Sequence, residues 1–328
     1  MNEEIAPTHT HKTSSGTESS AWERGVLEKV LLESIREQRI ARRWNIGFKL
    51  AFLAYLGIAL WAAFKPLSSA RPGVGKAHTA VIKIEGLIAD GSRANADAII
   101  RALKGAAENT GTKGIILKMN TPGGTPVQAA YVFEAIRTLK KDHPKLPVHA
   151  VVTDLCASGG YYIAAAADKI FVNPSSIVGS IGVIMNGFGF VGAMDKLGIE
   201  RRALTAGDHK ALLDPFRAIQ PTEQAHVQTV LNGIHQQFIA AVKEGRGPRL
   251  KDNPDLFSGL IWSGPEAVAL GLVDGYGDVR SVAEKEIGAA ELADFTETED
   301  WFERLSQRVG TTFAGLLWKN QLLTATLR

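Results

Sequence analysis

Strand-like and helix-like segments alternate along this chain from residue 78 onward, and this alternation restricts the possible folds more than any other feature. Segments rich in β-branched residues predict strands over 79–85, 114–119, 147–153, 169–172, 177–185 and 200–204. Apolar residues at helical spacing predict helices over 95–103, 127–141, 188–197, 222–244, 265–270 and 281–287. Short helical connections between successive strands favour parallel pairing. The chain is therefore predicted to fold as an α/β protein with a parallel sheet and flanking helices.

An apolar segment over 46–64 precedes this domain and is the predicted transmembrane anchor. At about 1.5 Å per residue its length matches a bilayer core, and Lys49 is its only charged residue. A cleaved signal peptide or a buried core helix fits less well, because a long polar stretch lies ahead of it. The cations before its start are Arg36, Arg39, Arg42 and Arg43. They outweigh the cations beyond its end, so we expect one pass through the inner membrane, with a cytoplasmic N-terminus and a periplasmic domain.

The chain divides by composition into parts of different character. The predicted parts are a disordered cytoplasmic tail (1–21), an amphipathic basic helix (22–45), the anchor (46–64), a linker (65–77), a globular domain (78–290) and a C-terminal amphipathic segment (291–328). In the last part, apolar residues recur at helical spacing from Trp301 to Trp318. This pattern favours a helix that lies on a partner subunit or at the membrane surface.

Composition also narrows the functions of the domain. The formal net charge of +3 arises from interspersed residues of both signs, which argues against nucleic-acid binding. Cys156 is the only cysteine, so an internal disulfide and a thiol-rich zinc cluster are excluded. His9 and His11 lie in the polar tail, where histidines are usually only solvated, and no metal is assigned to them. We expect neither a metal nor another cofactor.

A serine lies where the strand over 147–153 gives way to small residues that favour a helix. Ser158 is followed by Gly159 and Gly160, which leave its surroundings open. The first amides of a helix stabilise negative charge, so an oxyanion that forms at such a serine would be stabilised. The same pattern is typical of a simple helix cap, and the serine alone does not establish catalysis.

A serine nucleophile also needs an oxyanion hole and a base. Gly123 and Gly124 follow a predicted strand and can present backbone amides to an oxyanion. The candidate bases are Lys210, His209 and His149. A free lysine is only about 0.04% neutral at pH 7, so a lysine base needs burial beside apolar residues such as Leu212 and Phe216. Cys156 is rejected as the nucleophile, because it is expected to point into the sheet.

Four segments together resemble the signal peptide peptidase A family, which includes bacterial protease IV. They are Asn-Thr-Pro-Gly-Gly (120–124), Ala-Ser-Gly-Gly-Tyr-Tyr-Ile (157–163), Val-Gly-Ser-Ile-Gly-Val (178–183) and His-Lys (209–210). Their order and spacing agree with the single-repeat members over residues 78–285, including the 52 positions that separate Lys210 from Ser158. Thr121 stands where the family is expected to have serine, a mild change that should leave the turn intact.

The resemblance implies a fold like those of crotonase and the Clp protease, with a Ser/Lys dyad in place of a triad. It implies that Ser158 is the nucleophile, Lys210 the general base and Ser180 the residue that orients the lysine amine. It further implies an oxyanion hole formed by the amides of Gly124 and Ser158. In the short-form relatives, the serine and the lysine of one site come from neighbouring subunits of a closed ring, so a ring-like homo-oligomer is expected.

We therefore expect a membrane-anchored serine endopeptidase that cleaves hydrophobic peptides such as remnant signal peptides. Two alternatives stay open. A crotonase-like acyl-thioester enzyme would share the fold and the paired amides, but it would need a basic pocket for its coenzyme. A non-catalytic membrane scaffold would use Ser158 only as a helix cap.

Overall fold

The computed structural model describes residues 36, 39–40, 42–58 and 76–297, which fall into two units divided after Ser69. In the first unit residues 42–58 are helical and expose their apolar side chains. No helix among the described residues is both long enough and apolar enough to cross a membrane. The predicted anchor over 46–64 is described only as far as residue 58. The predicted tail, most of the basic helix and nearly all of the linker lie outside the described residues.

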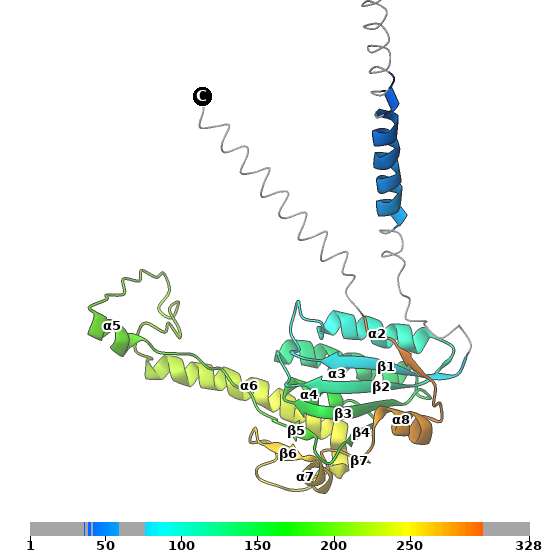
Figure 1. Ribbon diagram of the computed structural model, residues 1–328. Coiled ribbons are helices and arrows are strands. Elements are labelled where there is room, and N and C mark those ends of the chain that lie inside the picture. The colour runs from blue at the N-terminus through cyan, green and yellow to red at the C-terminus, as the bar shows by residue number, and fades with distance from the viewer. Residues whose placement is uncertain (1–35, 37–38, 41, 59–75, 298–328) are drawn as a thin grey trace, which may run out of the picture. The chain divides into compact units, whose positions relative to one another are not determined.

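The second unit is built on an eight-stranded sheet in which parallel pairing dominates (Figure 1). Its strands are β1 (His78–Glu85), β2 (Thr112–Thr121), β3 (Val148–Ala157), β4 (Lys169–Val172), β5 (Ile177–Gly179), β6 (Ile261–Ser263), β7 (Gly275–Tyr276) and β8 (Leu292–Asp294). Their order is β6-β5-β3-β2-β1-β8, with β4 beside β3 and β7 beside β4. The β5–β6 pair is antiparallel. The predicted α/β class with a mainly parallel sheet is confirmed.

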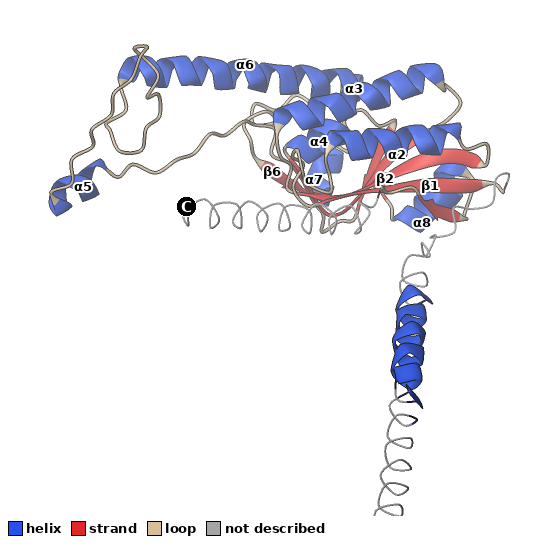
Figure 2. Cartoon of the chain, turned by 90° about the horizontal axis from the view of Figure 1, so that it is seen from above, coloured by secondary structure: helices blue, strands red, loops and turns tan. Residues whose placement is uncertain are grey.

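Helices cover the two faces of the sheet unequally. They are α2 (Ala96–Glu108), α3 (Pro126–Asp142), α4 (Gly159–Ala164), α5 (Val191–Leu197), α6 (Pro221–Arg246), α7 (Gly264–Ala269) and α8 (Val279–Val282). A π-helical turn, Ala283–Ile287, continues α8. Figure 2 shows α2 and α3 on one side of the sheet and α8 on the other. The flanking helices predicted from the sequence are therefore present.

Side chains that alternate along the strands explain this difference between the faces. In β1, Ile82 and Ile84 are buried in the main core with the helices, whereas Lys83 and Glu85 are exposed on the opposite face. β2 and β3 alternate in the same way. A smaller apolar cluster, which includes Ile116, Val151 and Phe171, lies on the opposite face beneath α8 and the π-helical turn. That face is thus covered over only part of its area.

The long helix α6 is fixed at its C-terminal end by a buried ion pair. Arg246 is completely buried, and its guanidinium binds the two Asp274 carboxylate oxygens at 2.7 and 3.0 Å. Asp274 also accepts a hydrogen bond from the Ile170 amide at 2.7 Å. Burial alone would raise the pKa of Asp274, but the hydrogen bonds and charge of Arg246 outweigh it and hold that pKa below its usual value. The base of α6 is therefore tied to β4.

The other end of α6 extends away from the sheet. Apart from Glu223, its buried residues are Phe238, Ala241, Val242 and Arg246, all toward the C-terminus. Figures 1 and 2 show the N-terminal part of α6 reaching beyond the sheet, with α5 past its end. We call residues 183–230, which include α5 and the start of α6, the arm. The arm leaves the domain just after β5.

The structure differs from the sequence-based expectation at two predicted strands, and its sheet extends past residue 290. The strand predicted over 177–185 ends at Gly179, because Gly179 and Ser180 have φ values of 101° and 51° that turn the chain out of the sheet. Residues 200–204 form no strand, since the arm gives their exposed side chains no neighbouring strand to pair with. The sheet continues beyond residue 290, because β8 pairs with β1.

Replacing Asp274 with asparagine tests the buried ion pair. The change leaves the charge of Arg246 buried without a counter-charge, so we expect the free energy of unfolding to fall by about 3–5 kcal/mol. Urea unfolding of the detergent-solubilised chain, followed by circular dichroism, measures this loss. Glu286→Gln is the matched control, because Glu286 pairs with Lys169 at 2.6 Å in a much more exposed position, where we expect less than about 1 kcal/mol. Equal losses in both variants would contradict the role of the buried pair.

Candidate active site

The junction between β3 and α4 holds Ser158 in a strained turn. Its φ and ψ are 51° and −123°, a conformation that residues with side chains rarely adopt. The Ser158 side chain makes no capping hydrogen bond to α4. A simple cap would have an extended backbone and a bonded hydroxyl, so capping does not explain this serine. A sharp turn between a strand and a helix is instead a geometry that exposes a nucleophilic hydroxyl.

The pairing of β3 with β5 brings Ser180 next to Ser158. Ala157 lies opposite Gly179 in the register, and each serine follows one of these residues. The Ser158 amide donates a hydrogen bond of 2.8 Å to the Gly179 carbonyl oxygen. Ser180 shares the unusual φ of 51°. Two of the predicted site residues, both partly exposed, therefore lie side by side at one end of the sheet.

The loop after β2 lies against the Ser158 turn. The Ile88 amide donates to the Gly123 carbonyl oxygen at 2.9 Å and holds this loop in place. Gly123 has a φ of 100°, and a Cβ atom there would lie 2.7 Å from the Gly159 nitrogen. A Cβ atom on Gly159 would lie 3.2 Å from the Gly124 nitrogen. The structure thus brings Gly124 beside the Ser158 turn, as predicted for an oxyanion donor.

The structure favours Gly159 over Ser158 as the second donor. The Ser158 amide, which the resemblance implied for this role, is already engaged with the Gly179 carbonyl oxygen. Within the described part of the chain, the amides of Gly124 and Gly159 have no hydrogen-bond partner. Two unpartnered amides beside a serine hydroxyl can stabilise an oxyanion. Gly159 directly follows the serine, a position from which hydrolase nucleophile turns commonly supply this donor.

Thr121 anchors the loop that carries Gly124, a role that the sequence did not reveal. Its buried hydroxyl donates to the Gly86 carbonyl oxygen at 2.6 Å and accepts from the Gly123 amide at 3.0 Å. Serine has the same hydroxyl and can make both bonds. This agrees with the expectation that threonine in place of serine leaves the turn intact.

A small cavity of about 110 Å³ lies beside Ser158. Its larger lining residues are Pro126, Tyr162, Val183, Ile184, Ile234 and Phe238. The ring of Tyr162 stacks on Phe238, with 4.8 Å between the ring centroids, and this contact joins α4 to α6. None of the described residues that line the cavity is Lys, Arg, Asp or Glu. The cavity therefore suits an apolar side chain.

Lys210 lies in the arm, and within one chain the structure does not bring it to Ser158. Lys210 is exposed. Its neighbour His209 places Nδ1 3.5 Å from the carboxylate of Glu223, in the first turn of α6. Ile234, which lines the cavity beside Ser158, lies 11 residues further along this helix. At 1.5 Å per residue that is about 16 Å along the helix axis.

Neither histidine proposed as a rival base lies beside Ser158 in one chain. His149 is buried near the start of β3 against Phe171, and it precedes Ser158 by nine residues of mostly extended chain, or more than about 20 Å. Burial lowers its pKa, and its Nδ1 atom has no partner among the described residues. His209 lies in the arm next to Lys210. Cys156 is buried, and burial raises the pKa of its thiol, which makes it a poor nucleophile.

Comparison with known proteins assigns the chain to a family. The model of peptidase family S49 matches residues 140–293, which include Ser158, Ser180 and Lys210. "Putative protease slr0021" of Synechocystis sp. is 32% identical over 196 residues, which make up 60% of this chain and 68% of that protein. The chain belongs to peptidase family S49.

Other relatives of this S49 chain carry different names. "Putative signal peptide peptidase SppA" of Enterococcus faecium is 30% identical over 213 residues, 62% of this chain and 61% of that protein. This agrees with the resemblance to signal peptide peptidase A. "Na(+)/H(+) antiporter NhaA" of Brucella abortus is 48% identical over 174 residues, 53% of this chain. The chain spans only 24% of the length of that antiporter, so the name describes a much longer protein than the matching segment.

Replacing Thr121 with valine tests the anchor of the Gly124 loop. Valine keeps the shape but leaves the buried Gly86 carbonyl and the Gly123 amide without partners, so we expect the free energy of unfolding to fall by about 2–3 kcal/mol. Chemical denaturation measures this loss. Thr121→Ser retains both hydrogen bonds and should cost distinctly less. If serine destabilised the chain as much as valine, the methyl group rather than the hydroxyl would be the important part.

Proposed function

We propose that this S49 chain is a serine peptidase in which Ser158 attacks the carbonyl carbon of a peptide bond. The observation that carries this proposal is the strained Ser158 turn beside the amides of Gly124 and Gly159, which have no partner among the described residues. The serine oxygen bonds to the carbonyl carbon, and the two amides receive the oxyanion. Departure of the amine leaves an acyl-enzyme ester, which water then hydrolyses.

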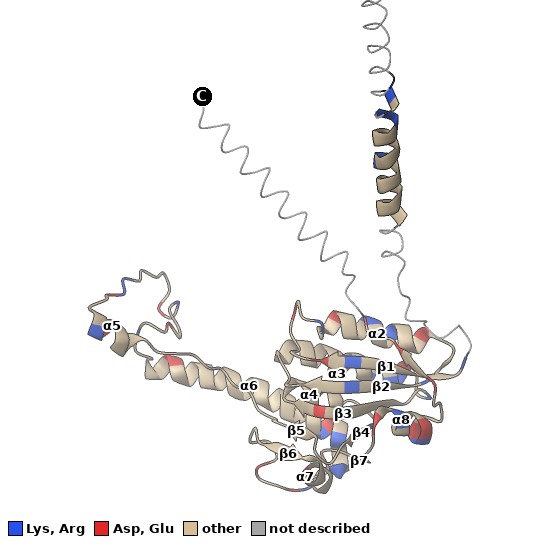
Figure 3. Ribbon diagram, viewed as in Figure 1, with Lys and Arg blue, Asp and Glu red and all other residues tan. Residues whose placement is uncertain are grey.

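We propose that the base for Ser158 is Lys210 of a second copy of the chain. Support comes from the separation within one chain and from the apolar character of the arm. Large apolar side chains are exposed there, among them Ile184 and Phe188 at 82% each. Residues 224–242 of α6 contain no Lys, Arg, Asp or Glu (Figure 3). A surface of this kind is typical of a protein interface.

A closed ring follows if the arm of each copy contacts the domain of the next. Such a contact joins two different surfaces, the arm of one copy and the domain of the next. Every arm and every receiving surface is in contact only when the subunits close into a ring. Burial of the arm would remove water from the lysine amine, and a dry site favours the neutral form that a base needs. In this site the Ser180 hydroxyl, beside Ser158, would hydrogen-bond the incoming amine and orient it.

We propose hydrophobic peptides near a membrane as substrates, with remnant signal peptides as one example. The apolar cavity beside Ser158 supports an apolar residue next to the scissile bond. The helix over 42–58, whose exposed apolar side chains follow a cluster of arginines, supports the anchor proposed over 46–64. Because positively charged residues favour the cytoplasmic side, the arginine cluster would place the N-terminus in the cytoplasm and the domain beyond the inner membrane.

The alternatives are less well supported. The cavity beside Ser158 is small and its described lining has no cation, whereas a coenzyme thioester would need a larger basic site. A scaffold function gives no reason for a strained serine that makes no capping bond. Labelling of Ser158 by a fluorophosphonate would be expected of the peptidase only.

Mixing two inactive variants tests whether the site forms between copies. Ser158→Ala lacks the nucleophile and Lys210→Ala lacks the base, so each alone should be inactive on a fluorogenic apolar peptide. If each site takes one residue from each of two neighbours, random 1:1 co-assembly should restore about a quarter of wild-type activity. Separately purified variants that are assayed alone are the control. If co-assembled mixtures stay inactive, the dyad does not form between copies.

Gly159→Ala tests the assigned oxyanion hole. The added Cβ atom would lie 3.2 Å from the Gly124 nitrogen and crowd both donors. We expect kcat to fall by roughly 100- to 1,000-fold while KM changes little. Gly105→Ala is the control, because a Cβ atom at this exposed position in α2 meets nothing within 4 Å. Activity of Gly159→Ala within a few-fold of the wild type would remove Gly124 and Gly159 from this role.

A further inference from the structure

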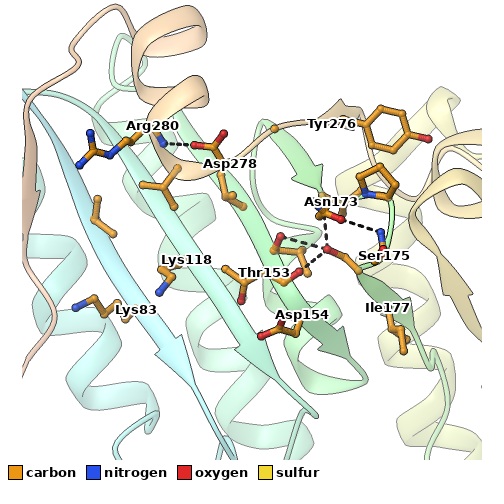
Figure 4. Close-up of a pocket in the computed structure, with 18 of the residues that line it drawn as sticks. Lys83, Lys118, Thr153, Asp154, Asn173, Ser175, Ile177, Tyr276, Asp278 and Arg280 are labelled. Carbon is orange, nitrogen blue, oxygen red and sulfur yellow. Dashed lines mark hydrogen bonds between the residues drawn. The ribbon is translucent and has the colours of Figure 1, made fainter.

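A groove of about 1120 Å³ lies on the face of the sheet opposite α2 and α3, and its charged lining residues are all at least partly exposed (Figure 4). Lys83 pairs with Asp294 at 2.7 Å and Lys118 with Glu85 at 3.4 Å, and each of these four side chains is at least 31% exposed. Exposed pairs of this kind contribute little to a fold. In the arm, by contrast, the Glu223 side chain is only 3% exposed.

Glu223 is the only buried residue of the arm, residues 183–230, all of which the structure describes. Burying a carboxylate costs free energy unless it is paired and hydrogen-bonded. An acidic residue in the first turn of a helix, the position of Glu223 in α6, is usually explained by the helix dipole. That role needs no burial, so the dipole does not account for this carboxylate.

Arg217 links the buried carboxylate to the residue that follows Lys210. Its Nη2 atom donates to both carboxylate oxygens of Glu223 at 2.6 Å. Its Nε and Nη2 atoms also donate to the Ala211 carbonyl oxygen, at 2.9 and 2.7 Å. The hydrogen bonds from Arg217 hold the pKa of Glu223 below its usual value. The carboxylate is therefore charged at neutral pH, and the guanidinium is held between two acceptors.

The residue that precedes Lys210 approaches the same carboxylate. His209 Nδ1 lies 3.5 Å from Glu223 Oε1. The Lys210 amide donates to the Gly207 carbonyl oxygen at 3.1 Å, and the Leu212 amide donates to the His209 carbonyl oxygen at 3.0 Å. Both neighbours of Lys210 are thus tied to one buried carboxylate, one directly and one through the guanidinium.

The loop that carries Lys210 also has a strained backbone. Among the described residues other than glycine, those with a positive φ are Ser158, Ser180 and Leu213. The first two lie at the candidate site, and Leu213, with a φ of 58°, lies three positions after Lys210. Such a conformation persists only where the surroundings hold it. Here the guanidinium bonds to the Ala211 carbonyl hold the chain two residues earlier.

We propose that Glu223 and Arg217 are positioning residues for Lys210. They hold the loop over 207–214 in shape within one chain, so that the arm presents its amine in a fixed place on reaching a neighbouring copy. This inference rests on the proposed function, in which Lys210 is the base for Ser158 of another copy. Neither positioning residue touches the substrate. Their effect is on rate, because a displacement of about 1 Å at a reacting group can cost about 100-fold.

Glu223→Gln in the full chain in detergent tests this role. Glutamine keeps the size of the side chain but removes the charge that the guanidinium binds, so the tether to Ala211 should loosen. We expect kcat on a fluorogenic apolar peptide to fall roughly 10- to 100-fold, with KM within about two-fold of the wild type. Sedimentation should show an unchanged assembly. Hydrogen exchange followed by mass spectrometry should show the amides of 207–214 exchanging several-fold faster.

Glu244→Gln is the matched control, because it makes the same substitution near the other end of α6. Glu244 pairs there with Arg137, and its side chain is 50% exposed. This variant should change neither kcat nor the exchange over 207–214. Arg217→Lys is a second test variant. It keeps a cation beside Glu223 but lacks the planar fork that binds both acceptors, so kcat should again fall with KM little changed.

Lys210→Ala, assayed beside these variants, separates the positioning role from the proposed function. If Lys210→Ala is inactive, the positioning role alone is overturned by a wild-type kcat in Glu223→Gln, by unchanged exchange over 207–214, or by a loss of activity that only follows a loss of assembly. If Lys210→Ala keeps wild-type activity, Lys210 is not the base, and both proposals fail.

Discussion

The position of β3 between β2, β4 and β5 is the constraint on which the site depends. Its first half pairs with β4 and its second half with β5, while β2 runs beside it on the other edge. Because all of these pairs are parallel, the ends of β2, β3 and β5 meet at one edge of the sheet. Gly124, Ser158 and Ser180 follow those three strands. Their proximity is a consequence of strand order, and the hydrogen bond from Ser158 to Gly179 fixes the turn that results.

The same end of the sheet is joined to the arm through α6. Tyr162, in the helix that follows Ser158, stacks on Phe238 of α6, and eight residues later Arg246 is buried with Asp274. A helix held at one end by apolar contacts and a buried ion pair can extend beyond the domain without a local partner, but its remaining apolar surface must then be covered elsewhere. The buried end of α6 thus lies at the candidate site of its own chain, whereas Lys210 lies in the arm, before the exposed end of α6.

The sequence allowed the local parts of this arrangement to be predicted, but not the parts that depend on distant contacts. Ser158 and Gly124 could be found because each follows a predicted strand and sits beside glycine, a pattern contained within a few residues. Ser180 lay inside the strand predicted over 177–185, and only the family resemblance pointed to it. The hydrogen bond from the Ser158 amide to the Gly179 carbonyl oxygen could not be predicted, because it depends on the register between β3 and β5. The Thr121 hydroxyl donates to the Gly86 carbonyl oxygen, 35 residues away, and this contact left no local signal. The strand predicted over 177–185 failed because an apolar pattern does not report the positive φ values that end it.

The cavity beside Ser158 explains why assembly and chemistry belong together in the proposed mechanism. One wall is formed by Val183 and by Ile184, which is 82% exposed, so in a single chain the cavity is open to water on the side where the arm begins. Water there would solvate the substrate carbonyl and keep a lysine amine charged, and both effects oppose catalysis. An arm from a neighbour would cover this wall and deliver the base in one step. Under the proposed mechanism, a chain that holds Lys210 away from Ser158 has little means of hydrolysing peptides before it has assembled.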